Sequence, residues 1–329
     1  MGVTSLAFPG APSSPARATA IAPAPARDAG SRPTGAAPPL GHRLVGLGLR
    51  AAGRASPALA GRLAGRLFLT PPRHERPARE HALLEFARPV LLRTERRERL
   101  AGWAFGDDAA PAVLLVHGWG GRGAQLGAYV SPLVARGRRV VAFDQLGHGD
   151  SDGRRNSLLG FARTIAQVVR LLGPVDGLVA HSLGAGASVL ALAAGAPVGR
   201  AVLVASPSRP DQAVARFAAY FGLDEAAREE MGRDIARRIG AGWDSVDILG
   251  HAPRLTAPLR LYHDRDDVEV PWAEAAELAA AAPEATLVTT TGLGHRRILH
   301  DAGVVEEAVR FLTAERGERP RSPQTNQIG

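Results

Sequence analysis

Short apolar segments alternate with amphipathic stretches between residues 112 and 314, and this alternation leaves few folds open to the chain. Six short segments each contain at least two Val or Leu residues and are as long as one strand: residues 112–118, 139–144, 177–182, 201–207, 259–264 and 286–292. Helical spacing marks the stretches between them, at residues 157–172, 183–194, 272–282 and 302–314. Buried strands joined by helices form a parallel sheet that is covered on both faces. We therefore predict an α/β fold here, preceded by a β-hairpin that begins at residue 88.

Residues 208–257 interrupt the alternation. They contain two stretches of helical pattern, Gln212–Leu223 and Asp224–Ile239, but no strand. Because they stand between two strands, we expect a helical lid over the carboxyl ends of the sheet, with an enlarged crossover helix as the alternative. The predicted core is then residues 88–207 and 258–316. Four aromatic residues of the insertion suit either contact with an apolar substrate or the lid's own core: Phe217, Tyr220, Phe221 and Trp243.

The two ends of the chain differ in composition from this core. Residues 1–40 are mostly Ala, Pro, Gly, Ser and Arg, and we predict that they and residues 317–329 are disordered. Amphipathic helices are predicted in residues 41–87, with Pro57 dividing residues 41–69 into two. Such a pair suits peripheral contact with a membrane surface, but packing on the protein itself is the commoner use and is the reading we favour. No apolar run approaches the ~20 residues of a transmembrane helix.

Basic residues are concentrated near the N-terminus. The net charge is +8, but residues 1–100 hold 16 arginines and 6 acidic residues, whereas residues 101–329 hold 24 arginines and 26 acidic residues. The predicted α/β part is thus close to neutral, and it lacks a basic stretch with interleaved aromatic residues. Nucleic acid is therefore not an expected partner.

Two residue types are missing from the chain. It contains no cysteine, and all 40 basic residues are arginine. Thiolate nucleophiles, Cys-ligated zinc and lysine-based chemistry are therefore excluded. No histidines have a metal-binding spacing such as H-E-x-x-H, so we expect neither a metal nor a cofactor. The N-terminal segment lacks the basic and then apolar regions of a secretory signal, and we expect a cytoplasmic location, with peripheral membrane contact as the option left open.

The strongest local motif is the segment Ala180-His181-Ser182-Leu183-Gly184, which follows an apolar strand and opens a helix. A serine on such a tight turn has its hydroxyl exposed above the sheet, and the residues two before and two after it must be small. Ser182 is therefore the predicted nucleophile.

A serine needs a base, and the base needs an acid to orient it. His295 follows the apolar segment that begins at Thr286, and an aspartate cluster follows the strand that ends near His263. In a parallel sheet these positions all lie at the carboxyl ends of strands. We predict His295 as the base and Asp267 as the acid, with Asp264 and Asp266 as alternatives for the acid.

Glycines follow another strand end, in the segment His117-Gly118-Trp119-Gly120-Gly121. Glycines allow the backbone to turn its N–H groups toward a site. The backbone N–H of Trp119 and that of Leu183 are predicted to form an oxyanion hole, in which one donor is worth ~2.7–4 kcal/mol of transition-state stabilisation.

Five motifs in this order resemble those of the α/β-hydrolase superfamily, and most closely those of its small bacterial esterase- and lysophospholipase-like members: HGWGG, FDQLGHGDS, AHSLGA, HDRDDVEVP and GLGH. The resemblance covers residues 88–315. It implies an eight-stranded, mostly parallel sheet with helices on both faces and hydrolysis through an acyl-enzyme, and it places the acid at Asp267. Ala180 departs from the common glycine of the family, and Asp264 stands where the family often has glycine.

The favoured function is hydrolysis of a small carboxylic ester, with lipid-like esters included. The same three residues would also serve acyl transfer, carbon–carbon hydrolysis or perhydrolysis, since one fold supports many chemistries. A non-enzymatic protein that binds membrane surfaces through its basic N-terminal part is the alternative from another class.

Overall fold

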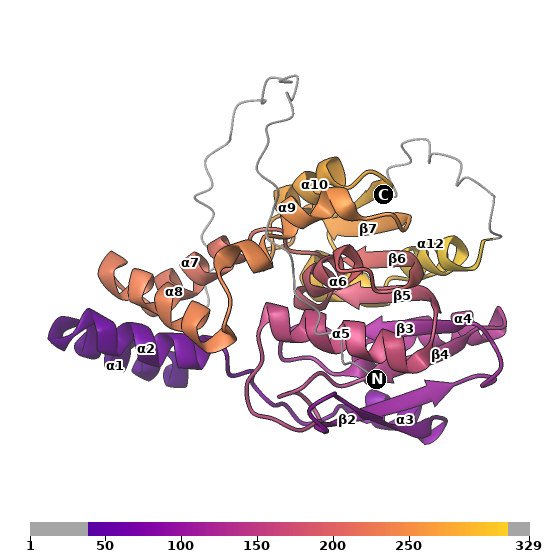
Figure 1. The fold of residues 1–329 in the computed structure, drawn as a ribbon, viewed down its shortest axis with the longest axis horizontal. Coiled ribbons are helices and arrows are strands. Elements are labelled where there is room, and N and C mark those ends of the chain that lie inside the picture. Colours follow the sequence, from indigo (N-terminus) through magenta and orange to yellow (C-terminus); the bar gives the residue numbers. More distant parts are fainter. Residues whose placement is uncertain (1–38, 315–329) are drawn as a thin grey trace, which may run out of the picture.

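The computed structural model describes residues 39–314 (Figure 1). The disorder predicted for residues 1–38 and 317–329 falls outside these residues. Leu40, which the sequence analysis placed in the disordered segment, is the first residue of a helix.

Eight strands form a single sheet in the order β1-β2-β4-β3-β5-β6-β7-β8. Strand β2 pairs antiparallel with both β1 and β4, and the other strand pairs are parallel. A tight hairpin joins β1 to β2, whereas parallel strands need crossover connections. The predicted eight-stranded, mostly parallel sheet is confirmed. Its strands are β1 (Arg88–Arg93), β2 (Arg99–Phe105), β3 (Ala112–Val116), β4 (Arg139–Phe143), β5 (Val175–His181), β6 (Val198–Val204), β7 (Leu259–Asp264) and β8 (Ala285–Thr290).

Helices cover both faces of the sheet, as predicted. One face carries α5 (Leu158–Leu172), α6 (Leu183–Ala193) and α10 (Trp272–Ala281), and the other carries the short helices η1 (Gly123–Tyr129) and α4 (Val130–Ala135) together with α12 (Ala302–Thr313). Strand β3 shows why its sequence is apolar throughout. Leu114 packs in the first core and Leu115 in the second, and both are fully buried. A strand buried on both faces has no polar side.

Short helical segments were not predicted individually. These are η1 and α4 between β3 and β4, α3 (Ala78–Glu85) before β1, and α11 (Gly294–Arg297) with η4 (Ile298–His300) after β8. Isolated helices of this length are unstable in water, so their sequences carry little helical signal. Packing stabilises them instead: Leu133 of α4 and Ile298 of η4 are fully buried in the second core.

The insertion at residues 208–257 is helical. It consists of α7 (Pro210–Phe221), α8 (Glu225–Ile239), η2 (Trp243–Val246), α9 (Ile248–His251) and η3 (Ala252–Arg254). Glu274 of α10 anchors its start, since one carboxylate oxygen accepts hydrogen bonds from the backbone N–H of Ser208 (2.9 Å) and Arg209 (3.0 Å). Figure 1 shows α7 and α8 projecting beyond the side of the core toward which the parallel strands point.

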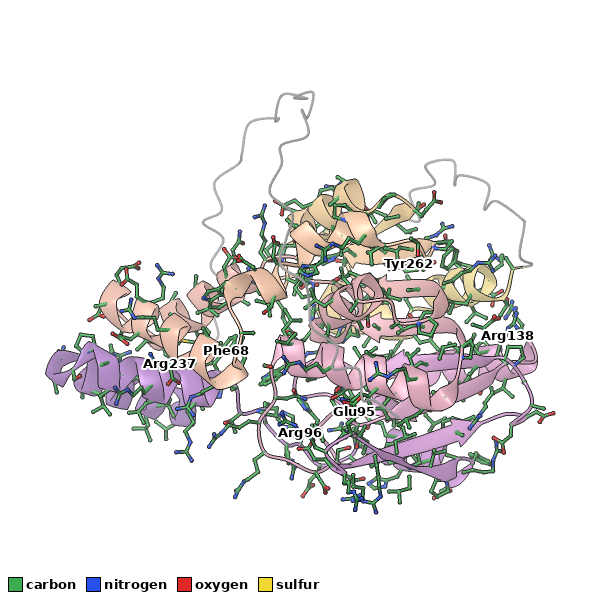
Figure 2. All side chains as sticks on the ribbon, viewed as in Figure 1. Phe68, Glu95, Arg96, Arg138, Arg237 and Tyr262 are labelled. Atoms are coloured by element: carbon green, nitrogen blue, oxygen red, sulfur yellow. The ribbon has the colours of Figure 1, made fainter. Side chains whose placement is uncertain are left out.

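The N-terminal helices α1 (Leu40–Ala55) and α2 (Pro57–Phe68) pack on this insertion, which agrees with the favoured prediction of packing on the protein itself. Gly65 of α2 lies so close to α8 that an added Cβ would stand 2.7 Å from a carboxylate oxygen of Asp234. Phe68, labelled in Figure 2, packs edge-on against Phe217 of α7 with ring centroids 5.2 Å apart. No helix in residues 39–314 is both long enough and apolar enough to cross a membrane.

Two of the four aromatic residues of the insertion take the core role that the sequence left open. Phe217 and Phe221 pack on each other with ring centroids 4.8 Å apart and belong to the core shared with α1 and α2. Tyr220 and Trp243 are exposed.

A buried ion pair ties α3 to the segment after β3. The Arg122 guanidinium donates two hydrogen bonds to the Glu80 carboxylate, Nε to Oε2 at 2.8 Å and Nη2 to Oε1 at 3.1 Å, and the Glu80 side chain is only 3% exposed. Replacing Glu80 with alanine would leave the Arg122 charge without its partner. We expect Glu80→Ala to lower the free energy of unfolding by about 3 kcal/mol, measured by urea denaturation.

The exposed pair Arg88–Asp108 provides the control for this variant. Asp108 is 66% exposed, so Asp108→Ala is expected to change the free energy of unfolding by no more than about 0.5 kcal/mol. Equal effects of the two substitutions would contradict the assignment of Glu80 to a buried structural pair.

Candidate active site

Ser182 lies at the sharp turn between β5 and α6. Its backbone has φ 51° and ψ −125°, a conformation that non-glycine residues rarely adopt, and its N–H donates to the carbonyl of Val204 on β6 (2.9 Å). Gly118 faces it closely, because a Cβ added there would stand 2.9 Å from the Ser182 Cβ. Strained turns of this kind persist where the surrounding packing enforces them. Ala180, fully buried, fits where the resemblance led us to expect glycine.

The structure brings the three predicted side chains together. The imidazole of His295 has its Nε2 3.0 Å from the Ser182 Oγ and its Nδ1 2.7 Å from the Asp267 Oδ2. His295 lies in the short helix α11, and Asp267 in the loop after β7. Asp267 and His295 are 7% and 8% exposed, so little water competes for these hydrogen bonds.

Hydrogen bonds hold Asp267 ionised. Its Oδ1 accepts from the backbone N–H of Glu269 (2.8 Å) and of Val270 (2.9 Å), while its Oδ2 faces His295. Burial by itself would raise the pKa of Asp267, but hydrogen bonds from His263 and His295 outweigh that effect and place the pKa well below its usual range.

The other two aspartates of the cluster have different partners. Asp264 accepts from the Thr290 hydroxyl (2.6 Å) and the Leu293 N–H (3.0 Å), and Asp266 accepts from the Gly292 N–H (2.8 Å). Both carboxylates thus stabilise the loop that carries His295 rather than its imidazole. Among the three aspartates, the geometry favours Asp267 as the orienting acid.

Neutral His117 shapes the segment predicted to form the oxyanion hole. Its Nδ1 donates to the Gly118 carbonyl (2.7 Å) and its Nε2 accepts from the Gln145 N–H (3.0 Å), so both ring nitrogens are used. Trp119 follows directly and packs edge-on against His148 with ring centroids 5.1 Å apart. Leu183, the second predicted donor, is the first residue of α6. Both predicted donor residues therefore lie next to the sharp turn that carries Ser182, called the elbow below.

Two further histidines contact the triad residues. His263 has its Nε2 2.9 Å from the Val270 carbonyl and 3.3 Å from the Asp267 Oδ2, the same carboxylate oxygen that His295 contacts. His181 donates from Nε2 to the carbonyl of His295 (3.0 Å). Nothing in the local sequence pattern indicates these contacts with Asp267 and His295, so they were not predicted.

Glu269 is a further residue that the sequence analysis did not single out. Its Oε2 lies 3.9 Å from the His295 Nε2, and its Oε1 accepts from the Arg296 Nε at 3.0 Å. Its position in the segment HDRDDVEVP, two residues after Asp267, was the available signal. In residues 39–314 no three His, Asp or Glu side chains are grouped so that they could hold a metal ion.

Three buried histidines next to the site are expected to make stability depend on pH. Burial lowers the pKa of His117 to about 4 and the pKa values of His148 and His181 to about 3. In the unfolded chain a histidine takes up a proton below pH ~6.5, whereas these three stay neutral in the folded state, so stability falls as the pH falls. We expect the free energy of unfolding to drop by at most about 4 kcal/mol per pH unit between pH ~6.5 and pH ~4.

Urea denaturation at a series of pH values measures this slope, and His148→Gln should reduce it by about one third, because one of the three titrating groups is removed. An unfolding free energy that stays constant from about pH 7 to about pH 5 would contradict this prediction.

Comparison with solved structures places the fold. The Pyrococcus furiosus esterase Pf2001 superposes with a TM-score of 0.57 at 22% identity, over 74% of this chain and 95% of the esterase. Est1E from Butyrivibrio proteoclasticus, solved with ferulic acid bound, superposes with a TM-score of 0.55 at 16% identity, over 68% of this chain and 96% of Est1E. The family description "alpha/beta hydrolase fold" matches residues 111–225, from the start of β3 through Ser182. The chain thus has the α/β-hydrolase fold, and residues 111–225 match the description of that family.

One relative of this chain carries a more specific name. RutD of Variovorax paradoxus, a candidate carbamate hydrolase, is 28% identical over 239 residues, which are 60% of this chain and 90% of RutD. The family match ends before Asp267 and His295. The positions of those two side chains relative to Ser182 therefore come from the structure.

Proposed function

We propose that this α/β hydrolase is a serine hydrolase that cleaves carboxylic esters through an acyl-enzyme. The observation that carries the proposal is the unbroken chain of contacts from the Ser182 Oγ to the His295 Nε2 (3.0 Å) and from the His295 Nδ1 to the Asp267 Oδ2 (2.7 Å). A hydroxyl, an imidazole and a carboxylate in this arrangement form the nucleophile, base and orienting acid of acyl transfer.

The acylation step follows from these roles. The Ser182 Oγ attacks the ester carbonyl carbon while His295 Nε2 takes the hydroxyl proton, and the carbonyl oxygen becomes an oxyanion. The backbone N–H groups of Trp119 and Leu183 stabilise that charge. When the tetrahedral intermediate collapses, the bond to the alcohol breaks and His295 returns its proton to the leaving oxygen.

Deacylation repeats the sequence with water. His295 removes a proton from a water molecule, whose oxygen attacks the acyl carbon, and the proton then passes to the Ser182 Oγ as the acid is released. Asp267 stays ionised throughout and stabilises the imidazolium that forms twice per turnover. Its low pKa agrees with this role.

The substrate class we propose is a small carboxylic ester, with lipid-like esters included. Similarity in fold to two esterases, one of them solved with ferulic acid, supports esters as the first class to test. The RutD relative adds carbamates, which the same acyl chemistry would cleave. Acyl transfer, carbon–carbon hydrolysis and perhydrolysis use the same groups, and reaction with alternative acceptors distinguishes them.

Labelling with a fluorophosphonate probe tests the proposal directly. The probe should attach to Ser182 alone, and mass spectrometry of the digested chain identifies the labelled residue. An excess of an ester that the protein hydrolyses should prevent the labelling. A panel of p-nitrophenyl esters of increasing chain length, with p-nitrophenyl carbamates and thioesters beside them, then assigns the acyl group. The proposal would be contradicted by a native chain that the probe does not label and that hydrolyses no member of the panel.

A further inference from the structure

The outer side of the two N-terminal helices carries a row of exposed leucines. Their inner side consists mainly of small residues, among them Gly61, Ala64 and Gly65, which pack toward α7 and α8. Five leucines point away from that contact and together form what we call the leucine face: Leu40, Leu44, Leu47, Leu59 and Leu63, which are 69%, 59%, 56%, 48% and 45% exposed. Single exposed leucines are common on protein surfaces. Five on two adjacent helices are typical of a surface that contacts a partner protein or a membrane.

Spacing in the sequence produces this face. Leu40, Leu44 and Leu47 stand four and three residues apart on α1, and Leu59 and Leu63 stand four apart on α2, so each set forms one stripe on its helix. Figure 1 shows α1 and α2 below α7 and α8, in a bundle that projects to one side of the sheet. In residues 39–314 no element is described as covering these stripes, and the five side chains remain exposed.

Positive charge surrounds the leucine face. Residues 39–74 contain no Asp or Glu, and five exposed arginines lie on the same two helices: Arg43, Arg50, Arg54, Arg62 and Arg66. An amphipathic helix with leucines on one face and arginines beside them binds to the interface of a lipid bilayer, and the arginines strengthen binding to anionic lipids.

A basic hollow adjoins the leucine face. It has a volume of about 200 Å³ and is lined by His42, Arg43, Gly46, Leu47, Arg50 and Tyr220. The Tyr220 hydroxyl lies 2.8 Å from the His42 Nδ1, and Arg50 donates to the Phe221 carbonyl, so both sides of the hollow are tied to α7. Leu47 belongs to both features. In this hollow, two arginines suit the phosphate group of a lipid, and the leucine beside them suits its acyl chains.

Charge also decides against two other occupants. A second copy of this face would bring arginines against arginines, and the segment 1–38 holds three arginines and one aspartate, so it too is basic. An anionic phospholipid surface complements the charge and provides the apolar layer that five leucines need. We propose that the leucine face docks the protein on an anionic phospholipid bilayer, independently of whether Ser182 is catalytic.

Vesicle sedimentation with the full-length chain tests this proposal. The native protein should bind vesicles that mix phosphatidylglycerol with phosphatidylcholine, and bind phosphatidylcholine alone at least about tenfold more weakly, because each arginine near the surface contributes to the attraction. The double variant Leu44→Glu/Leu47→Glu should lose binding by about tenfold or more, since two inserted side chains become charged. The double variant Arg54→Glu/Arg62→Glu should lose it to a similar degree.

Leu171→Glu is the matched control. Leu171 is 57% exposed at the end of α5, on the α/β core rather than on the bundle, and this variant should bind as the native chain does. All variants keep residues 1–38, so binding through that segment would survive both double substitutions. Circular dichroism and hydrolysis of a water-soluble ester should match the native chain for every variant, which separates this proposal from the catalytic one.

Three results would overturn the proposal: a native chain that does not sediment with the mixed vesicles, equal binding to neutral and anionic vesicles, or full binding by the Leu44→Glu/Leu47→Glu variant. If the leucine face instead binds only an acidic protein, the native chain would not sediment with the mixed vesicles.

Discussion

Replacing Ser182 with alanine is expected to lower kcat for p-nitrophenyl ester hydrolysis by about 10⁵- to 10⁶-fold, because the only group that attacks the carbonyl is removed. The residual rate comes from binding and from the oxyanion hole. The fold should remain intact, since the hydrogen bond that holds residue 182 to β6 comes from its backbone N–H to Val204. The measurement is the initial rate at saturating ester, together with the melting temperature of both proteins.

Ser188 supplies the control for the first variant. It lies six positions further along, on α6, where its buried hydroxyl donates to the Gly184 carbonyl at 2.7 Å. Ser188→Ala should keep kcat within about threefold of the native value while costing about 1 kcal/mol of stability. A Ser182→Ala protein that retained more than about a tenth of native activity would refute the assignment of the nucleophile.

The second large effect is expected at Asp267. In Asp267→Asn the amide cannot stabilise the imidazolium, and its NH₂ group favours the wrong tautomer of His295, so kcat should fall by about 10⁴-fold. The Ser182 and His295 side chains remain, and fluorophosphonate labelling should therefore slow rather than stop. The measurement is kcat at a pH where the native chain is stable, compared with the rate of labelling.

Asp264→Asn is the matched comparison, because Asp264 lies three residues away on the same strand end. Its carboxylate accepts from Thr290 and Leu293 but has no contact with the His295 imidazole among the described interactions. We expect a loss of stability and a fall in kcat of about tenfold or less, through a looser His295 loop. If Asp264→Asn proved the more damaging to kcat, the roles of the two aspartates would have to be exchanged.

The low pKa of Asp267 also bears on pH dependence. Its contribution to stability is present above the pKa of an unfolded aspartate and is lost only as the pH falls below about 4. Between pH ~6.5 and pH ~4, the expected loss of stability comes instead from the buried histidines His117, His148 and His181, which take up protons only when the chain unfolds. Comparison of the Asp267→Asn and His148→Gln variants by urea denaturation separates the two ranges.

The α/β architecture could be predicted from the sequence because it depends on local patterns. Runs such as residues 112–116 are apolar at every position, which only a strand buried on both faces requires. The elbow around Ser182 was visible for the same reason, since a strand, a tight turn and a helix are read from neighbouring residues. The short segments η1 and α4 escaped notice because packing, rather than their own sequence, makes them helical.

The choice among aspartates required the tertiary structure. The resemblance favoured Asp267, but local spacing does not separate it from Asp264 and Asp266. The turn after β7 decides which carboxylate reaches the His295 imidazole. The contact between His263 and Asp267 depends on the same turn.

Local periodicity thus determined the sheet, its helices, the elbow serine and the presence of amphipathic helices at the N-terminus. Only the tertiary structure decided that Asp267 faces His295, and that α1 and α2 bury their small residues on the insertion and leave the leucines outside. The physical reason is that strand and helix patterns arise within a few residues, whereas these contacts join residues 28 or more positions apart, across turns whose conformation no local pattern specifies.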